Sequence, residues 1–479
     1  MPRSDEAKER ADGDPRSRHE AMWREIAAIT WPAFVELVMS TLFGMVDMIM
    51  VGRLGPAAIA AVGLTNQPFM LLLAVFAAVN VGTTALVSWN IGGRHLRMAR
   101  TVTRQSLILN TILGLAIGLL GALAARPVVG LMGARSDTAI DAAAYFRIVA
   151  AGLPFQALTM GITAALRGAG ETTIPMLYNV GGNLLNVFGN YVLIYGKLGF
   201  PRWGVAGAAA STSISRLVAC LAGLYVVFRS RQTLVALRLK GDYRIVWPIV
   251  KKVFSIGLPA AMEQLVLQGG LTLFARTVSN LGTLQFAAHQ IGLNISGLSF
   301  SPSMACGVAA TTLVGQSLGG GDPEKAQRYA HAVHRMAMGI ACLMGAIFLA
   351  FSYSLARLYT SDLAAAALAG MVLKILALAQ PGQSTQLTLA GALRGAGDTL
   401  YPLYASIVGI WVFRVAVAYA FVQVFRWGLI GAWAALVLDQ YTRAAVIYLR
   451  FRSGRWKYAG AATTPRGRGR RRFAQEADY

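Results

Sequence analysis

The chain reads ALRGAGETTIP at residues 165–175 and ALRGAGDTLYP at residues 392–402, so a block of eleven residues occurs twice, 227 residues apart. The same offset relates many other positions, among them Pro32 and Pro259, Glu36 and Glu263, Leu54 and Leu281, and Gly92 and Gly319. Near the end of each half the offset falls to 224, where Trp203 and Gly207 match Trp427 and Gly431. Self-similarity at one fixed spacing indicates two copies of one structural unit.

The composition places these two copies in a membrane. Of the 479 residues, 56% are hydrophobic and only 14% are charged, and the mean hydropathy is +0.53. Soluble domains carry about a quarter charged residues, so we exclude a soluble enzyme. A membrane-spanning helix needs about 20 mostly apolar residues. The chain contains twelve such stretches, centred near residues 38, 72, 112, 152, 184, 216, 262, 298, 338, 378, 412 and 440.

Six of these spans fall in each copy, which predicts an all-α integral membrane protein of twelve transmembrane helices in two pseudo-symmetric six-helix lobes. Because each copy has an even number of spans, both run in the same direction through the membrane, related by a pseudo-twofold axis along the membrane normal. Such a pair encloses a central cavity. Rocking of the lobes about that cavity is the usual physical route to alternating access.

The distribution of charge predicts the topology. The chain has 44 Lys and Arg against 21 Asp and Glu, a formal net charge of +23. Basic residues of membrane proteins concentrate in cytoplasmic links, and here they crowd the link after the second span and the central link, which predicts that both termini are cytoplasmic. We expect a disordered cytoplasmic tail (1–24), an N-lobe (25–230), a cytoplasmic link (231–246), a C-lobe (247–452) and a basic cytoplasmic tail (453–479).

The basic tail is too rich in Gly and charge to fold, and we expect it to contact anionic lipid headgroups. Its RGRGRRR run could touch RNA in isolation, but a tail held beside a membrane makes a nucleic-acid partner the weaker interpretation. We expect a monomer. The three cysteines lie in apolar runs without metal-ligand spacing, so neither a zinc site nor a disulfide framework is indicated.

Several stretches together carry a resemblance to a known family. They are PAFVELVMSTLFGMVDMIMVGRLGPAAIAAVGL from Pro32, its echo GLPAAMEQL from Gly257, the pair TTALVSWNIGG and ATTLVGQSLGG, and the doubled LRGAG. They appear in one order, twice, at one spacing. From about residue 25 to residue 457 the chain resembles the multidrug and toxic compound extrusion (MATE) transporters.

The resemblance implies a V-shaped exporter in the inner or plasma membrane. It would exchange protons or sodium ions for organic, cationic or amphipathic drugs or toxic metabolites, with no cofactor besides the coupling ion. The alternative is a flippase for lipid-linked precursors from the same superfamily, which would need more positive charge in its cavity to hold a pyrophosphate. An intramembrane enzyme is disfavoured, because no HExxH, GxSxG or Walker sequence accompanies the spans.

Four acidic residues lie within the spans, namely Glu36, Asp47, Glu263 and Asp439. A carboxylate at the bilayer centre costs about 3 kcal/mol or more, so such groups are functional candidates. Glu36 and Asp47 are eleven residues apart, which brings them to within about 20° of one helix face, at levels about 16 Å apart. That face could hold a proton or a cation. The alternative is a carboxylate that only hydrogen-bonds neighbouring helices.

Asp47 is our candidate for the coupling residue, because MVDMIMVGRLG resembles the family segment whose aspartate binds the coupling ion. Asn186 and Asn190 stand at i and i+4 in the fifth span and can converge on one point. Together with Thr212 they resemble the rest of the family's N-lobe site, although ordinary interhelical hydrogen bonding would also explain them. Asn190 replaces an aspartate of archaeal relatives. One carboxylate favours a proton over sodium, and no metal other than a sodium ion at Asp47 is expected.

The C-lobe departs from the family pattern. Gln268 and Gln383 lie where some relatives have acids, so cation coupling should rest on the N-lobe unless Glu263 substitutes for them. Glu36 and Glu263 each follow a proline by four residues, so each is either an ionic group or a partner for backbone donors freed at a helix break.

Three further polar residues lie in the C-lobe spans. Asp439 precedes Arg443 by four residues, which predicts an ion pair within one helix. Arg414 is expected either to neutralise a carboxylate or to hold a helix break. His289 is expected to be packed and hydrogen-bonded rather than to relay protons.

A substrate cavity in such a protein would need aromatic and Met side chains for dispersion and cation–π contacts. The candidates are Phe69, Met70, Phe300, Met304 and Phe413. Packing against lipid explains them equally well.

Overall fold

The computed structural model describes residues 15–133, 136–230, 233–238 and 244–460. Within these residues every regular element is a helix, as the composition predicts. The helices of the first half are α2 (Pro15–Gly52), α3 (Pro56–Gly92), α4 (Leu96–Leu123), α5 (Ala125–Leu131), α6 (Ser136–Ala151), α7 (Leu153–Ala169), α8 (Thr173–Tyr195) and α9 (Gly204–Arg229).

The helices of the second half are α10 (Trp247–Ser279), α11 (Thr283–Gly319), α12 (Pro323–Arg357), α13 (Leu363–Gly395), α14 (Leu400–Ser406) and α15 (Gly428–Arg452). Two π-helical stretches, η1 (Ile407–Val417) and η2 (Ala420–Val424), continue α14, and a short 3₁₀ helix, η3 (Arg455–Tyr458), follows α15.

The predicted twelve spans are confirmed. Among the described residues, eight helices are long and apolar enough to cross a membrane, and α6 and α7, bent by 45° relative to each other, make a ninth. The remaining three are α8, α10 and α15. Each has the length of a span but carries amide or charged side chains along it, which lowers its hydropathy.

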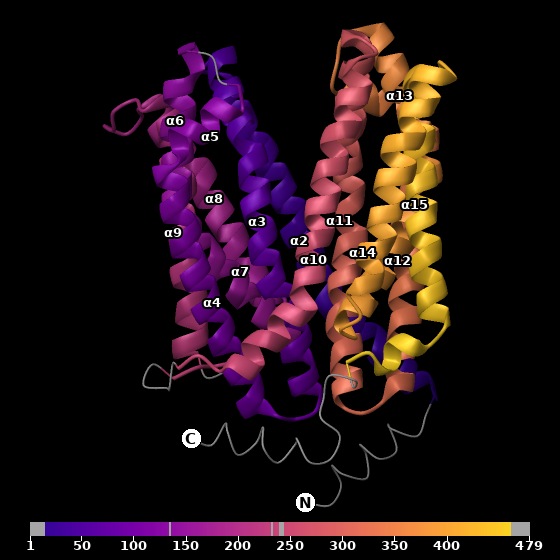
Figure 1. Ribbon diagram of the computed structural model, residues 1–479. Helices are drawn as coiled ribbons and strands as arrows, with labels where there is room; N and C mark the ends of the chain where they lie inside the picture. Colours follow the sequence, from indigo (N-terminus) through magenta and orange to yellow (C-terminus); the bar gives the residue numbers. More distant parts are fainter. Residues whose placement is uncertain (1–14, 134–135, 231–232, 239–243, 461–479) are drawn as a thin grey trace, which may run out of the picture.

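The spans form two lobes that correspond to the two sequence copies (Figure 1). The lobes diverge at one end and meet at the end that carries both termini. Each lobe has its own apolar cores. Across the lobe boundary α3 packs against α10 and α11, and α2 packs against α11.

The lobes meet through glycines that stand at equivalent positions of the two copies. A Cβ atom on Gly92 would lie 1.8 Å from the carbonyl oxygen of Gln316, and one on Gly319 would lie 2.0 Å from the carbonyl oxygen of Trp89. A Cβ atom on Gly257 would likewise collide with the backbone of Ala78, at 1.5 Å. Helix backbones therefore touch directly at the closed end of the molecule.

The doubled LRGAG block owes its sequence to the same kind of contact. Its first glycine, Gly168 or Gly395, lies against the backbone of the second helix of its own lobe, at Thr84 or Thr311. Its second glycine, Gly170 in the first block, has a φ of 90° that a side chain would strain. The block therefore ends a span and packs it tightly.

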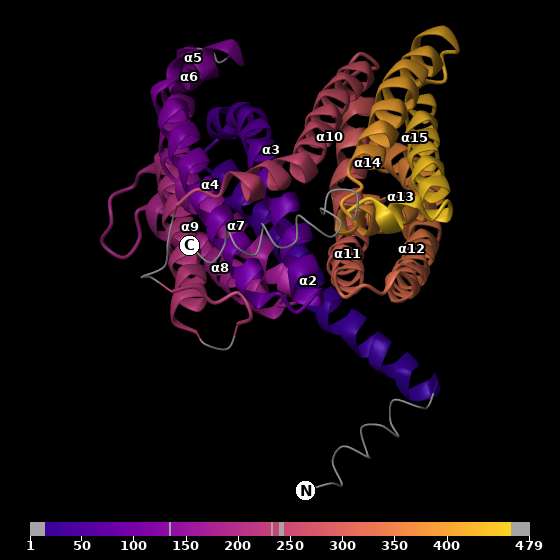
Figure 2. The ribbon, with the colours of Figure 1, turned by 60° about the horizontal axis from the view of Figure 1, so that its bottom comes forward.

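The expectations for the two tails need correction. The first helix begins at Pro15, inside the expected disordered tail, because Met22 and Trp23 pack against the C-lobe core. Figure 2 shows these first turns of α2 running toward α11 and α12.

In the central link Val235 and Leu237 are buried in the N-lobe core. After residue 452 the chain continues into η3, where Trp456 is buried against Phe451. The basic RGRGRRR run lies outside the described residues.

Candidate functional site

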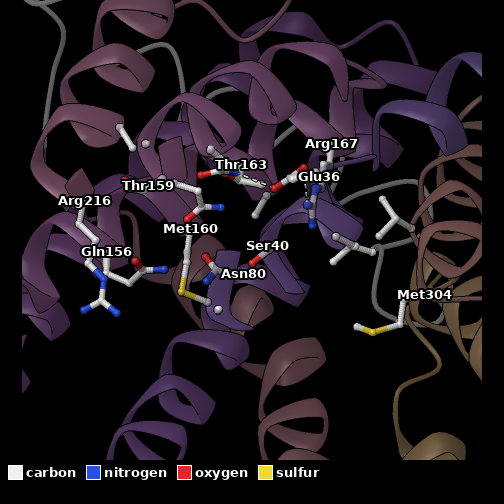
Figure 3. Close-up of a pocket in the computed structure, with 18 of the residues that line it drawn as sticks. Glu36, Ser40, Asn80, Gln156, Thr159, Met160, Thr163, Arg167, Arg216 and Met304 are labelled. Atoms are coloured by element: carbon white, nitrogen blue, oxygen red, sulfur yellow. Dashed lines mark hydrogen bonds and ion pairs between the residues drawn. The ribbon is translucent and has the colours of Figure 1, made fainter. Parts of the chain in front are cut away.

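A cavity of about 780 Å³ lies between the lobes and is lined mainly by the N-lobe helices α2, α3, α7, α8 and α9 (Figure 3). The C-lobe contributes a smaller wall from α11 and α13, which includes Met304 and Arg394. The lining mixes amides, hydroxyls, ionisable groups and methionines. Such a surface can hold a molecule that is partly apolar and partly charged.

One face of α2 forms the acidic side of this cavity. Glu36, Ser40 and Asp47 all line it, as the eleven-residue spacing of the two carboxylates predicts. The two carboxylates differ in their partners. Asp47 accepts a hydrogen bond from the side-chain amide of Asn190, which is fully buried on α8.

The other predicted residues of the N-lobe site lie beside this pair. The side-chain amide of Asn186 donates to the Thr212 hydroxyl at 3.2 Å and to the Ser211 hydroxyl at 3.4 Å. The Ser211 hydroxyl in turn donates to the backbone carbonyl of Asn186 at 2.8 Å. The contact joins α8 to α9. Asn186, Thr212 and Asp47 line the same cavity, so the structure brings together the groups that the sequence pattern selects.

Glu36, in contrast, is held in an ion pair. Its carboxylate lies 2.8 Å from the guanidinium of Arg167 and accepts a hydrogen bond from Asn179 at 2.7 Å. Figure 3 shows Glu36 and Arg167 meeting at the cavity wall. Arg167 is the arginine of the first LRGAG block.

The C-lobe repeats this arrangement at an offset of 227 for every member. Glu263 lies 2.8 Å from Arg394, the arginine of the second LRGAG block, and accepts a hydrogen bond from Ser406 at 3.2 Å. Sequence reasoning selected both glutamates but missed both arginines. The doubled LRGAG already contained the signal, because a repeated acid and a repeated base at one offset are candidates for pairing.

Asp439 is also neutralised. It lies 2.8 Å from Arg443, so the predicted ion pair within α15 is confirmed, and 2.7 Å from Arg414 of η1, which therefore neutralises a carboxylate. Among the four predicted intramembrane acids, Asp47 is thus the one for which the described residues provide no ion pair.

Arg216 is a site residue that sequence reasoning missed. It stands on α9 one turn after Thr212, lines the cavity, and interacts electrostatically with Asp47 and Tyr145. Figure 3 labels Arg216 and Gln156, which both line the cavity. An arginine inside the sixth span, four residues from a predicted ligand, was the available signal. Arg167 and Arg216 balance the two carboxylates of α2, so the acidic face does not make the cavity acidic overall.

The remaining polar candidates of the C-lobe lie away from the cavity lining. Gln268 is half-buried on α10, and Gln383 is fully buried on α13 with both polar atoms unpartnered among the described residues. His289 packs against Phe274 and Trp433, as predicted. The predicted hydrogen bond of His289 is wrong, because neither ring nitrogen has a partner in the described part of the chain. The rings that pack against His289 are those of aromatic residues.

Two of the five expected substrate residues, Met70 and Met304, line the cavity. Phe69 instead stacks on Phe146, with ring centroids 4.6 Å apart, inside the N-lobe core. Consecutive helical residues point about 100° apart, so Met70 and its neighbour Phe69 cannot share a face. Phe300 and Phe413 are half-buried and are not part of the lining.

The family model MatE matches residues 32–192 and 259–420, one copy in each lobe, with starting points 227 residues apart. The chain belongs to the MATE family of multidrug efflux transporters. The probable multidrug resistance protein NorM of Thermotoga maritima is 32% identical over 452 residues, which cover 94% of this chain and 97% of that protein. The multidrug resistance protein PmpM of Pseudomonas aeruginosa is 29% identical over 443 residues, which cover 90% and 92%.

Solved MATE structures share the fold. A crystal structure of MATE in the bent conformation superimposes with a TM-score of 0.84 at 28% identity, covering 94% of this chain and 97% of that one. The outward-facing conformation of a multidrug resistance MATE family transporter gives a TM-score of 0.85 at 28% identity, covering 91% and 96%. This MATE chain is a membrane transporter and not an enzyme.

Proposed function

We propose that this MATE transporter is a secondary antiporter of the inner or plasma membrane, which exports organic, cationic or amphipathic compounds in exchange for protons. The observation that carries the proposal is the position of Asp47 and the kind of partner that its carboxylate has. It lines the cavity, and its partner is the neutral amide of Asn190 rather than a cation. Such a carboxylate can take up a proton or attract a cationic substrate without breaking an ion pair.

The charges that line the N-lobe side of the cavity make the binding of the proton and the binding of the organic cation depend on each other. With both carboxylates ionised, Glu36 and Asp47 balance Arg167 and Arg216. Protonation of Asp47 leaves one excess positive charge, which repels an organic cation in a medium of low dielectric constant. The proton and the cationic substrate therefore disfavour each other's binding, which is the coupling that exchange transport needs.

The donor set favours a proton over sodium as the coupling ion. A sodium ion needs several oxygen ligands at once, and Asp47 supplies the single carboxylate of this site, with Asn190 in place of a second. The Asn190 amide is placed to donate to Asp47 rather than to face a cation with its oxygen. A proton needs only the carboxylate.

The arrangement of the lobes fits one step of alternating access. The end where the glycine contacts join the lobes carries both termini, and the Arg-rich link between α3 and α4 lies at the same end. Assigning this end to the cytoplasm follows the tendency of basic links to stay inside. The cavity would then face outward, the state in which substrate leaves and protons enter.

The proposal is tested in everted membrane vesicles that take up a fluorescent organic monocation. Uptake should follow an imposed proton gradient and ignore a sodium gradient at fixed pH. Asp47→Asn removes the ionisable oxygen and little volume, so uptake should be lost while the protein remains inserted. Glu324→Gln, an exposed acid at the start of α12, is the matched control and should transport normally. Full activity of Asp47→Asn would refute the proposal.

The second candidate, a flippase for lipid-linked pyrophosphates, gains support from the arginines. Arg167, Arg216 and Arg394 all line the cavity. Two of them are already paired with glutamates, which leaves Arg216 as the main candidate for an anionic group. Translocation of a polyprenyl pyrophosphate in liposomes that does not depend on Asp47, together with no transport of organic cations, would favour this function.

A further inference from the structure

The C-lobe contains a buried charged cluster in the place that corresponds to the N-lobe cavity. Its members are Arg414 on η1 and Asp439 and Arg443 on α15, with exposed fractions of 5%, 0% and 3%. In the N-lobe the equivalent positions, at the offset of 224, are Asn190, Ser215 and Ala219, and two of these line the cavity. Charged side chains thus occupy a site whose counterpart is open.

The cluster has one more positive than negative charge. Asp439 lies 2.7 Å from Arg414 and 2.8 Å from Arg443, so one carboxylate serves two guanidinium groups. Among the described residues no other acid forms an ion pair with either arginine, and Arg443 also donates a hydrogen bond to the Gln440 side chain at 3.1 Å. An uncompensated charge away from water is costly, so a second anion would stabilise this arrangement.

Unpartnered donors accompany the excess charge. The donors Nε of Arg414 and Nε2 of Gln383 are buried without a hydrogen-bond partner among the described residues, and so is the acceptor Oε1 of Gln383. Gln383 is fully buried on α13, and its equivalent at the offset of 227 is Gln156, which lines the N-lobe cavity, as Arg216 does. The pseudo-twofold relation therefore directs the Gln383 amide toward the region that the charged cluster occupies.

The backbone around the cluster is adapted to it. Arg414 sits on an 11-residue π-helical stretch, a form that is rare and is found mostly at functional sites. Gly409 on the same stretch leaves room for the cluster, because a Cβ atom there would lie 2.4 Å from Cγ of Arg443 and 2.5 Å from Oδ1 of Asp439. Charged groups can enter a helical core only where the backbone makes room for them, and both features provide that room.

We propose that the C-lobe binds one small inorganic monovalent anion, of which chloride is the abundant example, between Arg414 and Arg443 with the Gln383 amide as a further donor. Two guanidinium groups and an amide supply donors in the number that a halide accepts. A cation is disfavoured because the cluster is already positive. A phosphate or carboxylate substrate is disfavoured because the residues are closed off from solvent.

This site differs in place and in role from the coupling residues of the N-lobe. It holds η1 to α15 and so stabilises the last two spans of the C-lobe. His289 on α11 is a further titratable group that interacts electrostatically with Arg414.

The test uses the purified full chain in a neutral detergent. Thermal unfolding is followed in sodium chloride and in sodium gluconate at equal ionic strength. An anion bound well above its dissociation constant should raise the unfolding midpoint by about 3 °C or more in chloride. Arg414→Gln, which leaves Asp439 balanced by Arg443 alone, should unfold at the same temperature in both salts. Arg450→Gln, which breaks the 2.7 Å contact with Asp398 in the same lobe, should keep the chloride effect.

A second measurement does not depend on a variant that folds. Crystals of the unchanged protein grown in sodium bromide should show an anomalous peak between Arg414 and Arg443. Equal midpoints in chloride and gluconate, with no bromide peak at this place, would overturn the proposal. A chloride effect that survives in Arg414→Gln would also overturn it, since the anion would then bind elsewhere.

Discussion

Trp89 on α3 and Gln316 on α11 stand at equivalent positions of the two repeats, and each donates a hydrogen bond to a glycine carbonyl in the other lobe's LRGAG block. The indole Nε1 of Trp89 lies 2.6 Å from Gly395 O, and Nε2 of Gln316 lies 3.1 Å from Gly168 O. The same two residues present the carbonyls against which Gly319 and Gly92 pack. One pseudo-twofold contact therefore closes this end of the transporter.

Gly319→Ala should bias the transporter away from the closed contact. A Cβ atom would lie 2.0 Å from the Trp89 carbonyl, and backbone on both sides cannot yield without separating the lobes. We expect a Cys at position 304, in a background without the exposed Cys342, to react faster with an impermeant maleimide from the cytoplasmic side. Gly339→Ala meets nothing within 4 Å and is the control. Equal labelling in both variants would contradict this view of the gate.

Arg216→Gln should strengthen the binding of organic cations. The variant removes the positive charge that acts on Asp47, so the cavity becomes net negative when Asp47 is ionised. An electrostatic gain of this kind should lower the apparent KM for a monovalent cationic substrate by about tenfold, with little change for a neutral one. The exposed Arg229→Gln on the same helix is the control. A KM that falls equally for both substrates would point to altered packing instead.

Glu171, in the turn between α7 and α8, makes the docking of the central link depend on pH. Its carboxylate accepts a hydrogen bond from the Leu234 backbone at 2.9 Å, while partial burial raises the pKa of this carboxyl above its usual value near 4.5. A raised pKa means that the folded protein holds this proton more tightly than the unfolded chain. Stability from this group is therefore greatest below the unfolded value and falls as pH rises toward the folded pKa.

Glu171→Gln should remove that dependence, because the neutral amide oxygen still accepts from Leu234 without the burden of a buried charge. The melting temperature of the variant should exceed that of the parent at pH 7, and the difference should shrink as pH falls toward about 4.5 and change little below that pH. Differential scanning fluorimetry between pH 4 and pH 8 measures it. A variant that is less stable at pH 7 would show that the ionised form is the one that holds the link.

Much of the fold could be predicted from the sequence, because repeats and apolar stretches can be recognised from the order of residues along the chain. An offset of 227 residues defined the lobes, and it also related Glu36 and Glu263, whose pairings are equivalent in the structure. The neighbours Asp47 and Asn190 lie 143 positions apart, and their contact followed from a family resemblance rather than from spacing.

Contacts between helices explain what could not be predicted. The pairing of Glu36 with Arg167, and the electrostatic interaction of Arg216 with Asp47, depend on how α7 and α9 rotate against α2, which hydropathy does not define. The same rotation separates Phe69 in the core from its neighbour Met70 in the cavity lining. The period of a helix predicts which residues share a face, but it does not predict which other helix that face packs against.

Asn190→Asp should convert the coupling site toward sodium. Asn190 is fully buried and already contacts Asp47, so the substitution places a second carboxylate against the first with little change in volume. Two carboxylates in contact cannot both remain ionised without a cation between them. Sodium would then meet two charged ligands, and the hydroxyl of Thr212 lines the same cavity as Asp47. We expect efflux of an organic cation by the variant to respond to a sodium gradient at fixed pH.

The matched control for this substitution is Asn183→Asp, which adds a carboxylate to the cavity lining on the same helix but away from the Asp47–Asn190 pair. It should remain insensitive to sodium, because the residue of α8 that contacts Asp47 is Asn190 and not Asn183. The parent protein should be equally insensitive. Sodium-driven efflux by the parent protein would show that amide and hydroxyl oxygens around a single carboxylate suffice for the metal ion. Asp47 would then couple sodium rather than proton flow to export.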